Sequence, residues 1–161
     1  MVRFCFEKLT GLETDLIAFS DDMDGFWKGP YNVPNKEQLS KYLDYPLTTV
    51  PDPFNICNRF GEHNNAKLVE FLNRFNLPFT FQSSTEAYKS GVFNETIKKI
   101  LLNYEKILNV VLPTLGEDRR KTYSPFFPID ENTGKILQVP VNEINTDDFT
   151  ISFTHEGKNY V

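Results

Sequence analysis

The chain has little cysteine, histidine or tryptophan: its 161 residues include two Cys, two His and one Trp. Cys5 and Cys57 are too few for a disulfide framework or a zinc ribbon, so the sequence predicts no zinc or other metal site and a reduced, cytoplasmic setting. No apolar run approaches the ~20 residues that a membrane-spanning helix needs, which predicts no membrane partner. The amino-terminal segment also lacks the small-residue cleavage site of a signal peptide.

Basic residues are in deficit as well. There are 17 Lys and Arg against 22 Asp and Glu, which gives a net charge of -5. Proteins that hold nucleic acid mainly through its phosphates are usually basic, because counterion release supplies the affinity. The chain is therefore a poor candidate for a principal RNA-binding surface. With 15 Phe and 7 Tyr, however, it has the apolar mass for a packed core.

Hydrophobic spacing predicts alternating helices and strands. The expected elements are a helix over 2–9 that Gly11 ends, a strand over 15–20, a short helix over 36–43, an amphipathic helix over 62–75, a strand over 79–83 and a longest helix that runs from Asn94 until Pro113 closes it. Residues 26–58 are otherwise rich in Pro, Asn and Asp and are expected to be mostly irregular. The helix-to-strand order predicts an α/β fold with a partial Rossmann-type parallel sheet and flanking helices.

After residue 121 the pattern changes to alternation. Strands are expected over 136–141 and 149–153, with turns at 132–134 and 155–157. This predicts a small antiparallel β insertion over 122–161, beside a catalytic-type α/β domain over 1–121.

Three carboxylates, Asp21, Asp22 and Asp24, follow the first predicted strand. Ligands of open α/β sheets bind just beyond the carboxyl ends of the strands, so these groups are placed to hold a cationic group such as a substrate ammonium. The alternative is that one or more of them caps the following turn, and Asp24, next to Gly25, is the first choice for that role.

Several ordered segments resemble one known family. They are the acidic run 16–25, then 26–35, 46–54, Phe60-Gly61-Glu62-His63-Asn64-Asn65, 88–91 and 112–117. In this order they resemble class I lysyl-tRNA synthetases over about residues 2–141, and a string of motifs is far more specific than a lone one. The resemblance implies a lysine–tRNA ligase that uses ATP, with Mg²⁺ expected, to activate lysine and transfer it to tRNA(Lys) in translation.

The same comparison indicates what the chain does not contain. No HIGH-type motif and no KMSKS-type loop occurs, so we expect an internal part of such an enzyme that does not aminoacylate alone. The strand expected before Met1 is missing, which predicts an exposed sheet edge and marginal stability or self-association. In some similar enzymes the region after 121 carries a Cys/His zinc site. This chain has no cysteine after Cys57, which excludes such a site in that region.

The resemblance also implies site residues. One of Asp21 and Asp22 is expected to contact the α-amino group of lysine. His63, Asn64 and Asn65 are expected near the adenylate or the tRNA end, although capping of a helix start explains them at least as well, and His63 has no catalytic or metal partner in the sequence pattern.

Arg119 and Arg120 could contact phosphates of the acceptor arm, and a solvated charged turn is the favoured alternative. Two other functions stay open: a non-catalytic binding module derived from a synthetase core, and a hydrolase that uses Asp21 and Asp24 as paired carboxylates.

Overall fold

The computed structural model describes residues 2–30 and 32–161, which form two compact units, Met1–Ser90 and Gly91–Val161. The first unit contains a two-stranded parallel sheet and the second a three-stranded antiparallel sheet, each with helices. The predicted mixed α/β class is therefore confirmed. The domain division at residue 121 stays a prediction.

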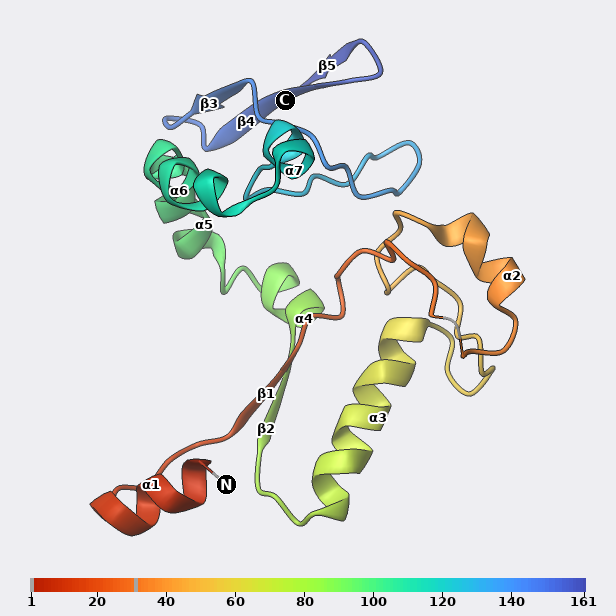
Figure 1. The fold of residues 1–161 in the computed structure, drawn as a ribbon, viewed down its shortest axis with the longest axis vertical. Helices are drawn as coiled ribbons and strands as arrows, with labels where there is room; N and C mark the ends of the chain where they lie inside the picture. Colours follow the sequence, from red (N-terminus) through yellow and green to blue (C-terminus); the bar gives the residue numbers. More distant parts are fainter. Residues whose placement is uncertain (1, 31) are drawn as a thin grey trace. The chain divides into compact units, whose positions relative to one another are not determined.

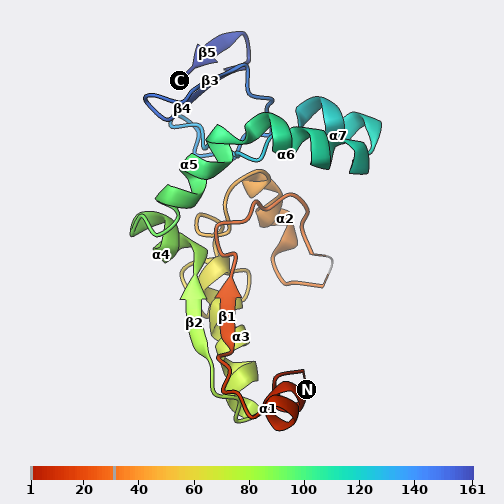
Figure 2. The ribbon, with the colours of Figure 1, turned by 90° about the vertical axis from the view of Figure 1, so that its left-hand side faces the viewer.

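The first unit is built around one pair of strands. Its elements are α1 (Val2–Thr10), β1 (Ile17–Ser20), α2 (Lys36–Leu39), the 3₁₀ turn η1 (Ser40–Tyr42), α3 (Phe60–Arg74), β2 (Thr80–Ser83) and α4 (Ser84–Lys89). β1 and β2 pair in parallel, with Ile17 opposite Thr80 and Ser20 opposite Ser83, so both strands end at the same edge (Figure 2). α3 runs alongside this pair and connects back to β2 (Figure 1).

Helix α1 ends where the sequence predicts. Gly11 has a positive φ of 71°, and its N–H bonds to the carbonyl of Glu7, a helix end that glycine allows without steric strain. Arg3 then ties α1 to the rest of the unit by donating to Glu7, to Thr14 and to the carbonyl of Pro78, just before β2.

The hydrophobic core of the first unit is formed by the segment between β1 and α3 together with the first residue of α3. Its buried members are Phe26, Leu39, Val50 and Phe60, and the rings of Phe26 and Phe60 meet edge to face at 6.3 Å. Backbone hydrogen bonds from Phe60 to Val50 and from Gly61 to Leu47 hold the start of α3 against this segment. The irregular segment is therefore a fixed platform that places the first turn of α3.

The second unit contains α5 (Asn94–Leu102), α6 (Tyr104–Val111), the 3₁₀ turn η2 (Leu112–Thr114), α7 (Glu117–Thr122), β3 (Glu143–Asn145), β4 (Thr150–His155) and β5 (Lys158–Tyr160). The strands form an antiparallel sheet in the order β3-β4-β5. Glu156 and Gly157, both at positive φ, make the tight turn between β4 and β5, as predicted for 155–157. The rings of Phe153 and Tyr160 stack across this hairpin at 5.3 Å.

Two predicted elements of the second unit are wrong. The helix from Asn94 to Pro113 is interrupted at Asn103, whose side chain donates to the carbonyl of Lys99 and whose backbone leaves the helical region. The longest helix is instead α3, with 15 residues, and no helix in residues 2–30 and 32–161 is long and apolar enough to cross a membrane.

The strand predicted over 136–141 is also absent from the described residues, where Ile136 forms only an isolated bridge with Ile129. Ile136 and Leu137 are both buried although they are neighbours, so their side chains do not alternate as in a half-exposed strand. Pro140 further lacks the N–H that a sheet ladder needs.

Candidate functional site

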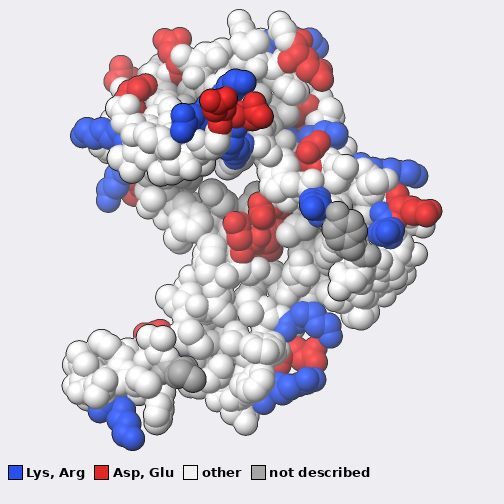
Figure 3. All heavy atoms as spheres, in the orientation of Figure 1, with Lys and Arg blue, Asp and Glu red and all other residues white. Residues whose placement is uncertain are grey.

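The acidic segment lies at the carboxyl end of β1, as predicted. Asp21, Asp22 and Asp24 follow Ser20 directly, and the neighbouring strand β2 ends beside them at Ser83. Figure 3 shows acidic side chains gathered where β1 ends. The segment thus occupies the edge of a parallel pair where ligands of open sheets bind.

Asp22 is buried, with only 6% of its surface exposed, and its carboxylate accepts five hydrogen bonds from three segments. Oδ1 accepts from the Ser84 hydroxyl at 2.9 Å and from the N–H and hydroxyl of Thr85 at 2.9 and 2.8 Å. Oδ2 accepts from the Ser83 hydroxyl at 2.5 Å and from the Asn65 amide at 3.0 Å. These bonds join the end of β1 to the start of α4 and to α3.

This environment keeps the Asp22 carboxylate ionised. Burial by itself raises the pKa of Asp22, but hydrogen bonds from Ser83, Thr85 and Asn65 stabilise the charged form more strongly, so the pKa lies well below its usual range. Because the lone pairs of both oxygens are engaged by protein donors, this carboxylate braces the end of the sheet and has little capacity left for a ligand.

Asn65, predicted near the adenylate, is one of the hydrogen-bond donors to Asp22. Its amide oxygen accepts from the hydroxyl of Ser20 at 2.5 Å while its amide nitrogen donates to Asp22. Asn65 therefore connects the second turn of α3 with Ser20, the last residue of β1. Gly61 allows this close approach, because a Cβ there would lie 3.3 Å from the Asp22 carbonyl oxygen.

Asp21 and Asp24 are the exposed members of the acidic segment. Asp24 shapes the turn, since its carboxylate accepts from the N–H of Gly25 at 2.7 Å and its N–H donates to the carbonyl of Asp21. These two bonds fit the turn-forming alternative for Asp24, and its contact with a substrate stays a prediction. Among the described residues, the Asp21 carboxylate makes no hydrogen bond or ion pair, which leaves it available at the end of β1.

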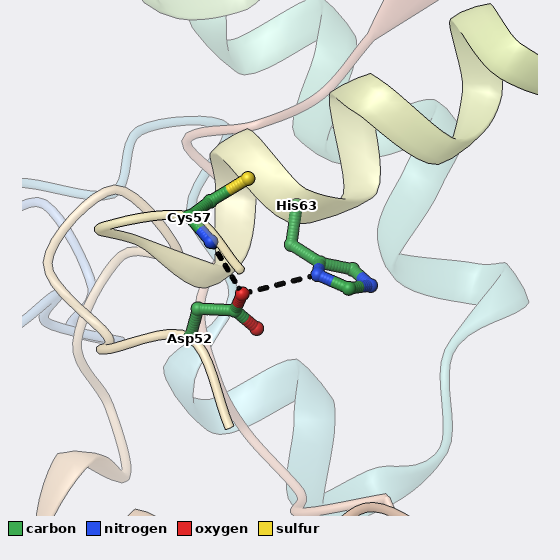
Figure 4. Close-up of side chains that lie close together, drawn as sticks. All are labelled: Asp52, Cys57 and His63. Atoms are coloured by element: carbon green, nitrogen blue, oxygen red, sulfur yellow. Dashed lines mark hydrogen bonds and ion pairs between the residues drawn. The ribbon is translucent and has the colours of Figure 1, made fainter. Parts of the chain in front are cut away.

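His63 lies in the first turn of α3 and is buried, and the structure supplies the partners that the sequence pattern did not reveal. Its Nδ1 lies 3.1 Å from Oδ2 of Asp52, and the ring of Phe54 stacks on it at 4.6 Å. Cys57 lies beside both (Figure 4). His63 is therefore not isolated, as the sequence pattern implied, but lies beside a carboxylate and a thiol.

Asp52 organises the turn that follows it. Its carboxylate accepts from the backbone N–H groups of Phe54, Ile56 and Cys57. Burial raises the pKa of Asp52, but these N–H groups and the His63 ring favour the charged form, so the pKa lies below its usual value. A fixed, charged carboxylate thus faces the imidazole.

The remaining predicted site residues, Asn64, Arg119 and Arg120, make none of the contacts described above. Asn64 is exposed on α3. On α7, Arg120 donates to the carbonyls of Leu115 and Pro113, while Arg119 donates to Gln138 and lies over the ring of Phe127. Both guanidinium groups thus have contacts within their own unit, and their contact with RNA stays a prediction.

Comparison with known proteins decides the family. A family model described as tRNA synthetases class I (K) matches residues 1–160. The chain belongs to this family. The resemblance found in the sequence is therefore confirmed.

Curated relatives agree with this assignment. The chain is 47% identical over 161 residues to a lysine–tRNA ligase of Rickettsia felis, covering all of this chain and 31% of that protein. It is 47% identical over 157 residues to that of Rickettsia bellii, covering 98% of this chain and 30% of the relative. It is 45% identical over 161 residues to that of Rickettsia typhi, covering all of this chain and 31% of that protein. The chain thus spans about a third of the length of these relatives.

Proposed function

We propose that this chain is the part of a class I lysine–tRNA ligase that recognises the amino acid. In this account Asp21, at the carboxyl end of β1, contacts the α-amino group of lysine. Asp22 is a positioning residue, which holds the end of β1 against α3 and α4. Asp24 shapes the turn that follows.

The observation that carries the proposal is the difference in burial and hydrogen bonding between the neighbouring carboxylates of Asp21 and Asp22. Asp22 is buried and saturated with hydrogen bonds, whereas Asp21 is exposed and uncompensated among the described residues. A charge-assisted bond from an ammonium to such a carboxylate contributes roughly 1.5–3 kcal/mol when formed away from bulk water. The family membership supplies lysine as the amino acid whose ammonium is bound.

The whole enzyme would join lysine and ATP into lysyl-adenylate and then transfer the lysyl group to tRNA(Lys). This class works mainly by positioning the reactants and stabilising the charge that develops on the α-phosphate. This chain has neither ATP-binding motif, so we assign it no residue that holds ATP or Mg²⁺. Its role is to orient the lysine so that the carboxylate meets the nucleotide.

Exposed apolar side chains fit a place inside a larger catalytic domain. Phe4 and Leu9 on α1, Phe19 on β1, Phe71 on α3 and Phe75 just after it are all exposed in the first unit. Such side chains on several neighbouring elements are typical of a sheet and helices that pack against further structure. Cytoplasmic location likewise remains part of this proposal.

A chimera tests the proposal. The matching third of the Rickettsia felis lysine–tRNA ligase, 47% identical, is replaced by this chain, and lysine-dependent pyrophosphate exchange and tRNA charging are measured. We expect both activities to be retained. A folded chimera that binds ATP but neither activates nor binds lysine would instead favour the alternative of a non-catalytic module.

A further inference from the structure

We propose that Asp52, Cys57 and His63 form a binding site for one zinc ion, separate from the amino-acid site. The three side chains offer a carboxylate oxygen, a thiol sulfur and an imidazole nitrogen, and these atoms lie within 4.8 Å of one another. Zinc takes this mixture of ligands, and three protein ligands with one water complete its tetrahedron.

The geometry of two ligands is already suitable. Oδ2 of Asp52 and Nδ1 of His63 are 3.1 Å apart, close to the roughly 3.3 Å that separates two ligands of a tetrahedral zinc with bonds of about 2.0–2.1 Å. The sulfur of Cys57 has to move inward until it meets the ion, because zinc–sulfur bonds are only about 2.3 Å long. Cys57 lies in an irregular turn and is partly exposed, so a side-chain rotation can supply this movement.

The surroundings hold the ligands in place. The Asp52 side chain is fully buried, and three backbone N–H groups fix its carboxylate. Two of them donate to Oδ2, where the zinc ion would take the place of the His63 hydrogen bond. The ring of Phe54 stacks on His63 and covers it from solvent. Ligands oriented by such outer contacts bind metals more tightly than free ones.

Binding needs one proton to leave the protein. The Cys57 thiol gives its proton to solvent as the sulfur–zinc bond forms. The Nδ1 proton that His63 donates to Asp52 is lost to solvent and Nε2 takes one up, so His63 binds zinc as a neutral ring through Nδ1. The ion would then lock the turn 52–57 to the first turn of α3. Asn65, two residues after His63 on the same helix, donates to Asp22. Zinc would therefore stabilise the platform beneath the end of β1.

Cobalt is the probe, since a thiolate ligand gives cobalt(II) a charge-transfer band and a tetrahedral site gives intense visible bands. The reduced, chelator-treated chain is titrated with cobalt and then with zinc. We expect one cobalt per chain, displaced by zinc, and a rise in the denaturant midpoint of unfolding with zinc. The Cys57→Ser variant is expected to lose the charge-transfer band and the rise in midpoint.

Cys5→Ser is the matched control, because Cys5 is exposed on α1 and far from the cluster in the sequence. It is expected to bind cobalt like the unaltered chain. His63→Gln should weaken binding at least tenfold and gives a second test if Cys57→Ser does not fold. Absence of the band in the unaltered chain, its survival in a folded Cys57→Ser variant, or an unchanged cobalt affinity in His63→Gln would each overturn the proposal.

Discussion

The hydroxyl of Ser83 donates a hydrogen bond to Oδ2 of Asp22 at 2.5 Å, and this bond joins the ends of two parallel strands. Ser83 also caps α4, because its oxygen accepts from the N–H of Glu86. A single carboxylate at the end of β1 thus fixes both where β2 stops and where the next helix begins.

Replacing Asp22 by Asn should lower the free energy of unfolding by about 2 kcal/mol, because an amide group cannot accept all five hydrogen bonds and places N–H donors against the donors of Ser83 or Thr85. Denaturant unfolding measures the change. Asp21→Asn is the matched control and should change stability by less than about 0.5 kcal/mol, since that carboxylate is exposed. Equal losses in the two variants would refute the bracing role of Asp22.

The contribution of Asp22 should also depend on pH. Its pKa in the folded chain lies below the ordinary value of 3.8, so the stabilisation is complete above that value and declines as the pH falls below it. The difference in unfolding free energy between the unaltered chain and Asp22→Asn is therefore expected to shrink from about pH 6 to about pH 3. Other acidic groups are common to both proteins and cancel in the difference. A difference that stays constant or grows on acidification contradicts the assignment.

Gly25 should not tolerate a side chain. A Cβ at this position would lie 2.3 Å from the ring of Trp27, so Gly25→Ala has to displace the indole, at about 1–3 kcal/mol. Gly29→Ala is the control, because its Cβ would meet only Phe26 at an ordinary 3.7 Å. Trp27 is the sole tryptophan, so its fluorescence reports both the altered packing and the unfolding midpoint. Similar midpoints and spectra for the two variants would show that the turn is looser than described.

Local patterns predicted α1, β1, α2, α3 and β2 of the first unit, because their apolar spacing and helix ends agree with the final packing, but they did not predict α4. The end of α1 at Gly11 and the position of α3 follow from nearest neighbours in the sequence. In the second unit the side chain of Asn103 competes for a helix carbonyl, and Ile136 and Leu137 are both buried, so periodicity alone gave the wrong answer there.

The candidate site was predictable only in part. An acidic run after a strand pointed to the right edge of the sheet, but the donors that saturate Asp22 lie 43 to 63 positions further along the chain. The partners of His63 were hidden for a related reason. Asp52 lies 11 residues before it and reaches it only because the turn 52–57 folds back on α3. The tertiary structure, and not the local sequence, therefore decides that Asp21 is exposed and that Asp22 is held by hydrogen bonds.

The kcat/KM for lysine of the chimera carrying Asp21→Asn tests the central claim most directly. Loss of a charge-assisted bond of roughly 1.5–3 kcal/mol predicts a fall of about ten- to a hundredfold in kcat/KM for lysine, with the KM for ATP unchanged. Asp24→Asn, which changes a carboxylate three residues away, should alter the lysine value far less. An unchanged lysine kcat/KM in the Asp21→Asn chimera would contradict the account.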